Sequence, residues 1–195
     1  MRVVVVVKKI NWLLVIGMII GTLYYVVLEY DSDRILTYLA VIPVLVAPLL
    51  LKKTKFKLSD RELCCYYVFV FMADFIGCVA NLYNTTEWYD VFVHFCSGIF
   101  TFGVGLFILD KINIGKDNFG FKMFFSIGVV ALVAVVWELF EYGADVLLRL
   151  DFQHNVDTGV DDTMVDMLAA IVGGLLSIVG CYVINKRNRA KNLVN

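Results

Sequence analysis

Charge is scarce in this sequence, and that scarcity excludes most soluble folds. Only 18% of the residues are charged and 61% are hydrophobic, with a mean hydropathy of +0.80. A typical soluble domain is about 45–50% apolar and about 25% charged, and its helices keep a polar face. The long apolar blocks of this chain have no such face. The sequence therefore predicts an integral membrane protein whose main partner is membrane lipid.

Other classes are excluded by what else is missing. The net charge is −1 and there is no basic-aromatic motif, so nucleic acid is not expected as a partner. The five cysteines form no C-x-x-C pair and lie in apolar blocks, which favours small buried residues over disulfides or a metal site. No small-residue cleavage site follows the first apolar run, so we expect that run to remain as a span. An inverted repeat, common in carriers, is also absent.

The apolar runs predict an all-α polytopic membrane protein with six transmembrane helices. Because the connectors are short, we expect residues 1–195 to form a single integral membrane domain. The second span is the shortest and contains Pro43 and Pro48, which favours a kinked or partly re-entrant helix. The expected spans are roughly residues 10–29, 35–51, 63–83, 91–109, 123–144 and 163–184.

The basic residues predict the orientation of these spans. With a cytoplasmic N-terminus, 15 of the 17 lysines and arginines fall on the cytoplasmic side, and only Arg34 and Arg149 fall outside. Cytoplasmic loops of membrane proteins carry such an excess of basic residues. We therefore predict an N-in, C-in topology and a multi-pass location in the bacterial inner membrane.

The most unusual feature is a group of three carboxylates at the end of the fifth expected span. Glu138, Glu141 and Asp145 are separated by three and four residues, so they share one face of a helix. An ionisable group inside a membrane helix costs about 2.5–3.5 kcal/mol on insertion scales. Groups retained at such a cost are expected to have a function.

The predicted orientation brings polar residues of other spans to the same outer level. Asp90 and His94 lie one turn apart at the start of the fourth span, and Asp166 lies one turn inside the sixth. From this convergence we predict a polar pocket that opens to the extracytoplasmic side. Its candidate catalytic residues are His94, Glu138, Glu141 and Asp166, and its candidate metal ligands are these four together with Asp90, Asp145, Asp157 and Asp162.

Structural roles compete for several of these residues. Asp161 and Asp162 lie where carboxylates favour a helix N-terminus, and Asp90 is also placed to cap its span. Trp88, Tyr89 and Trp137 suit an interfacial aromatic belt and receive no chemical role here. Asp74 lies near the middle of the third span, where it is either a proton site or a neutral helix–helix hydrogen bond.

Carboxylates and imidazole at one depth favour either of two chemistries. They can bind one divalent metal ion, since oxygen ligands suit magnesium, calcium or manganese and an added histidine allows zinc or iron. Such an ion would activate water against a lipid headgroup or an envelope precursor. Without a metal, the same groups suit proton relay or general acid–base catalysis.

Three ordered motifs in the C-terminal half carry a family resemblance. They are Tyr89-Asp90-x-x-x-His94-x-x-x-Gly98, Glu138-x-x-Glu141-Tyr142 and Asp157-Thr158-Gly159-x-Asp161-Asp162-x-x-x-Asp166-Met167, followed by Gly173 and Gly174. This half resembles the YjdF-like bacterial inner-membrane proteins, whose function is unknown, and is more weakly similar to VanZ-like membrane proteins. The first resemblance implies a multi-span inner-membrane protein. The second implies a role in the cell envelope, because VanZ-like proteins are associated with glycopeptide (teicoplanin) resistance.

Three functional hypotheses follow, and the sequence leaves open whether the protein is an enzyme. The first is a membrane enzyme or binding protein that holds a divalent cation and acts on envelope lipid or its precursors. The second is a small proton- or ion-coupled carrier, in which Asp74 links the outer site to the middle of the membrane. The third is a structural membrane protein whose acids only cap helices and hold the helices together.

Overall fold

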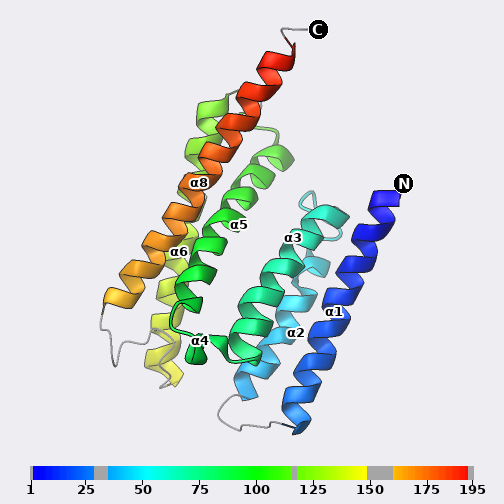
Figure 1. The fold of residues 1–195 in the computed structure, drawn as a ribbon, viewed down its shortest axis with the longest axis vertical. Coiled ribbons are helices and arrows are strands. Elements are labelled where there is room, and N and C mark those ends of the chain that lie inside the picture. The colour runs from blue at the N-terminus through cyan, green and yellow to red at the C-terminus, as the bar shows by residue number, and fades with distance from the viewer. Residues whose placement is uncertain (1, 29–34, 116–117, 149–159, 193–195) are drawn as a thin grey trace. The chain divides into compact units, whose positions relative to one another are not determined.

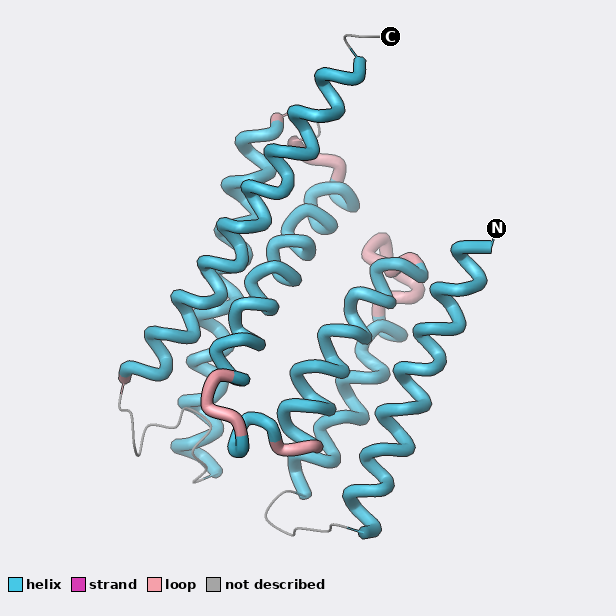
Figure 2. Tube along the Cα trace, in the orientation of Figure 1, coloured by secondary structure: helices cyan, strands magenta, loops and turns pink. Residues whose placement is uncertain are grey.

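The computed structural model of this chain is helical (Figures 1 and 2). It describes residues 2–28, 35–115, 118–148 and 160–192, and no strand occurs in these ranges. Five helices are long and apolar enough to cross a membrane. They are Val4–Leu28, Asp60–Val79, Tyr89–Ile112, Phe119–Leu147 and Asp161–Lys191.

The second expected span is a helix that is shorter than these five. Helix α2 (Ile35–Leu50) has 16 residues and contains Pro43 and Pro48. About 20 apolar residues are needed to cross the hydrocarbon core of a bilayer without distortion. The structure therefore supports a multi-pass membrane protein, while the count of six spans stays a prediction.

The chain divides into two compact units, Met1–Val93 and His94–Asn195. The first contains α1 (Arg2–Leu28), α2, α3 (Asp60–Val70), the π-helix η2 (Phe71–Val79) and the short α4 (Leu82–Thr85). Helix α5 (Tyr89–Ile112) begins in the first unit and continues into the second. The second unit is completed by α6 (Phe119–Leu148) and α8 (Asp161–Asn192).

The start of α3 is defined by local hydrogen bonds. Ser59 and Glu62 form a capping box, in which each side chain accepts a hydrogen bond from the backbone N–H of the other residue. The side-chain amide of Asn11 in α1 donates to the backbone carbonyl of Asp60 at 2.9 Å. These bonds fix the first turn of α3 and tie it to α1.

Apolar packing joins the helices of the first unit. Met18, Tyr67 and Val70 form one buried cluster, and a second contains Tyr38 and Val79. The long helix that starts at Asp60 changes from α to π geometry at Phe71. This π-helical segment ends at Val79. Asn81, two residues later, has a φ of 67°, a left-handed conformation that asparagine tolerates better than most residues.

The second unit contains a close approach of α5 and α8. A Cβ atom added at Gly98 would lie 1.9 Å from the carbonyl oxygen of Ala170, and one added at Gly173 would lie 2.1 Å from that of Phe95. Only glycine allows two backbones to approach so closely in a membrane bundle. Beside them, Phe102, Val130 and Ala170 belong to one buried apolar cluster.

The three helices of this unit run in alternating senses. Helices α5 and α8 start at the same end of the unit, and α6 runs in the opposite direction (Figure 1). Acidic residues occupy the first turns of α5 and α8, and basic residues occupy their last turns. One end of the unit is therefore acidic, and the candidate site lies at that end.

Candidate metal centre

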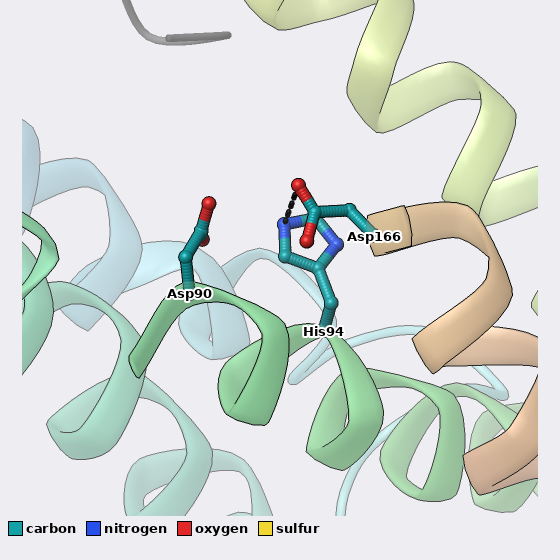
Figure 3. Close-up of side chains that lie close together, drawn as sticks. All are labelled: Asp90, His94 and Asp166. Carbon is teal, nitrogen blue, oxygen red and sulfur yellow. Dashed lines mark ion pairs between the residues drawn. The ribbon is translucent and has the colours of Figure 1, made fainter. Parts of the chain in front are cut away.

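Helices α5 and α8 bring three ligand-type side chains together (Figure 3). One ligand atom from each of Asp90, His94 and Asp166 lies within 4.8 Å of the others. Asp90 and His94 are one turn apart and project from the same side of α5, while Asp166 comes from α8. We refer to these residues as the Asp–His–Asp triad.

The glycine contact explains why His94 and Asp166 face each other. Gly98 in α5 meets Ala170 in α8, and both helices run in the same direction. Moving back one turn from each contact residue leads to His94 and Asp166. The approach of the two backbones therefore sets the separation of these two side chains.

Burial distinguishes the triad from ordinary surface acids. His94 is 7% exposed and Asp166 is 2% exposed, while Asp90 is half-buried. Two carboxylates this close repel each other when both are ionised, and the effect grows in a medium of low dielectric constant. A divalent cation between them removes this repulsion, which is one reason why buried acids collect at metal sites.

The distances suit ligands of a common ion. His94 Nε2 and Asp166 Oδ2 are 3.9 Å apart, too far for a hydrogen bond between these two atoms. Nitrogen and oxygen ligands bound at about 2.0–2.2 Å from one zinc ion lie about 3–4 Å from each other. The ligand atoms of the triad, which all lie within 4.8 Å of one another, are therefore close to the separation that a shared ion requires.

Glu138 lies on the buried face of α6 at about the depth of Asp166. Val130, Ala134 and Glu138 are spaced one turn apart, and all three are buried. A Cβ atom added at Gly174 in α8 would meet the side chains of Ile127 and Val130 in α6. Helices α6 and α8 are antiparallel (Figure 1). Eight residues after Val130 comes Glu138, and eight residues before Gly174 comes Asp166, so both acids lie about 12 Å from this contact towards the same end of the unit.

The other candidate residues lie outside the triad. Glu141 is half-buried and accepts a hydrogen bond from Trp137 Nε1 at 2.8 Å, along the exposed side of α6. Asp145 and Asp162 are half-buried, and neither belongs to a metal-type group among the residues that the structure describes. Asp157 lies outside the described residues.

Comparison with known protein families assigns the chain to one of them. The family model described as "Predicted membrane protein (DUF2238)" matches residues 10–187. The chain belongs to this family. YjdF is another member, so the first resemblance is confirmed at the level of an uncharacterised membrane family. No curated protein and no solved structure matches the chain.

The DUF2238 match extends the resemblance beyond the motifs that suggested it. Those motifs lie between Tyr89 and Gly174, whereas the matched residues also include α2, α3 and most of α1. All members of the triad fall inside the matched range. The family description names no reaction or metal.

One residue beside the triad differs from its expected role. Trp88 and Trp137 are exposed, as an interfacial belt requires, but Tyr89 is only 4% exposed. Its hydroxyl donates to the backbone carbonyl of Met72 at 2.8 Å. The aromatic run Trp88-Tyr89 carried no signal for this difference, because the partner is a backbone atom in another helix.

Proposed function

We propose that this protein binds one divalent transition-metal ion through Asp90, His94 and Asp166 and uses it to act on an envelope lipid or its precursor. The observation that carries the proposal is the meeting of three ligand atoms within 4.8 Å, two of them from buried residues. An imidazole ligand suits zinc or iron better than magnesium or calcium. We therefore expect Zn²⁺ or Fe²⁺.

The proposed reaction class is metal-assisted hydrolysis. Catalytic zinc sites commonly use three protein ligands and leave a position for water or substrate. A divalent ion held by these three residues would supply a water that is nucleophilic at neutral pH and a Lewis acid for a phosphoryl or carbonyl oxygen. Glu138 is our candidate for the base that accepts the proton of that water, because it is buried at about the depth of Asp166.

The proposed orientation gives the site access to the outer leaflet. We propose an N-in, C-in protein of six spans that forms one domain in the bacterial inner membrane. The acidic first turns and basic last turns of α5 and α8 support this orientation, because basic ends favour the cytoplasm. The triad then lies near the extracytoplasmic surface, where lipid-linked precursors are exposed.

Metal content tests this proposal directly. Full-length protein purified in mild detergent is expected to contain about one zinc or iron ion per chain, which a strong chelator removes. His94→Ala is expected to lose the metal because it removes the nitrogen ligand, while Glu138→Gln is expected to keep it because a base need not be a ligand. Elemental analysis measures all three proteins.

The matched control is Asp162→Asn, which removes a carboxylate one turn before Asp166 on the same helix but outside the triad. It is expected to retain the metal of the unmodified protein. Metal-free unmodified protein would contradict the proposal, and so would equal metal contents in His94→Ala and Asp162→Asn.

A second candidate function is a proton-coupled carrier, and the position of Asp74 favours it. This carboxylate lies in η2, inside the candidate span Asp60–Val79. Single π-helical turns occur often at functional sites, and acids within spans commonly serve as proton sites.

For the carrier, the unmodified protein in proteoliposomes is expected to move protons down an imposed pH gradient. Asp74→Asn is expected to abolish this movement because the amide cannot release a proton, whereas Asp110→Asn, at the exposed end of α5, is expected to preserve it. An entrapped pH dye measures the flux. Equal flux in both variants would rule out Asp74 as the proton site.

A further inference from the structure

Tyr89, which directly precedes the proposed ligand Asp90, connects the start of α5 with the π-helical segment of the preceding span. It is the first residue of α5, and Asp90 follows it directly. Its hydroxyl donates to the carbonyl oxygen of Met72, which lies in η2. Both residues belong to the first compact unit. The hydrogen bond therefore holds the turn of α5 that carries Asp90.

The π geometry of η2 suits this contact. A π-helix bonds residues five positions apart, which gives a wider turn than the α-helix. A carbonyl oxygen has two lone pairs, so Met72 can accept a bond from another helix in addition to one within its own.

A second contact reaches Tyr89 from the same segment. The ring of Tyr83 lies against Gly77 of η2, where an added Cβ atom would come within 2.3 Å of the ring carbon Cε2. The same Tyr83 ring also contacts Tyr89: the two ring centroids are 5.5 Å apart in an edge-on arrangement.

From these contacts we infer that Tyr89 is a positioning residue of the metal centre, which holds Asp90 in register with His94 through its bond to the Met72 carbonyl. The inference rests on the proposed function, since it assigns a role in the same site. Groups that orient a metal ligand typically change metal affinity by about 10- to 100-fold when they are mutated. A purely structural hydrogen bond has no such effect on the metal.

The chain offers a matched control for Tyr89. Tyr66 in α3 also donates its hydroxyl to a backbone carbonyl, that of Val44 in α2, at 2.7 Å. Both bonds are partly buried and both lie in the first unit. Tyr66→Phe and Tyr89→Phe therefore remove the same kind of bond, but only the second removes one beside the triad.

The experiment is a Co²⁺ titration of the full-length chelator-treated protein and the two variants in detergent, followed by the visible absorption of the bound ion. Tyr89→Phe is expected to weaken Co²⁺ binding about tenfold or more and to change the shape of the absorption bands, because the ligand geometry changes. Tyr66→Phe is expected to match the unmodified protein in both respects. The melting temperatures without metal show whether each variant is folded.

The outcomes separate this inference from the proposal on which it rests. Tight binding to the unmodified protein, with equal affinities and spectra in the two variants, overturns the role of Tyr89 and leaves the metal centre intact. Equal weakening in both variants also overturns it, because the effect would then be general. No binding to the unmodified protein overturns both the inference and the proposed function.

Discussion

Asp166→Asn is expected to abolish the stabilisation of the protein by metal. A ligand that binds only the folded state stabilises it by about 2.7 kcal/mol when its free concentration is 100 times its Kd. The unmodified protein is therefore expected to melt at a higher temperature in the presence of Zn²⁺. Asparagine has nearly the same shape as aspartate, but its neutral amide is a far weaker ligand, so the variant is expected to lose this shift.

The measurement is thermal unfolding in detergent, with chelator and with excess Zn²⁺. Asp162→Asn serves as the control on the same helix and is expected to keep the full shift, because Asp162 lies outside the triad. This experiment also tests the structural hypothesis, in which the acids only hold the helices together. That hypothesis predicts a loss of stability already without metal, and the same response of all proteins to Zn²⁺.

Gly173→Ala is expected to destabilise the second unit and to impair the site from two turns away. The new methyl group would lie 2.1 Å from the carbonyl oxygen of Phe95, a backbone atom that no side-chain rotation can move. Overpacking of this kind typically costs about 1–3 kcal/mol, and contact with backbone favours the upper end of that range. Since α5 and α8 have to separate, His94 and Asp166 are expected to move apart.

The control for this substitution is Gly180→Ala on the same helix. A Cβ atom at Gly180 meets nothing within 4 Å, so this variant should gain about 0.5–1 kcal/mol from the higher helix propensity of alanine. Melting temperature and Zn²⁺ affinity are measured for both proteins. Unchanged stability and affinity in Gly173→Ala would show that α5 and α8 do not depend on this contact.

The sequence predicted the long helices well because their apolar runs are uninterrupted. It placed their ends less well, since α8 continues to Asn192 through the basic segment that follows Ile184. Charged residues end the apolar run but not the helix, because an α-helix remains stable as it leaves the bilayer. The change to π geometry at Phe71 had no sequence signal, because no residue type in 71–79 requires it.

For the site, the sequence predicted that the acids lie near the same end of their helices, but not which of their side chains point into the helix bundle. Glu138 and Glu141 share one broad face of α6, yet Glu138 is buried while Glu141 bonds to the exposed Trp137. Spacing alone cannot separate them, because a helical face spans more than 100°. Which edge of that face turns inward depends on how closely the helices pack. In this unit, Gly98 and Gly173 allow α5 and α8 to pack closely, and this role depends on the backbone of the other helix, which the sequence does not reveal.

The π-helical segment also constrains how the length of this chain can vary. Within Phe71–Val79 the backbone accommodates a wider turn than the α-helix on its N-terminal side. Loss of one residue there would be absorbed by a return to the narrower α-helical turn, so the chain beyond it would stay close to its present orientation. Loss of one residue from the α-helical part of the same span, Asp60–Val70, would instead rotate everything beyond it by about 100°, the angle between successive residues of an α-helix.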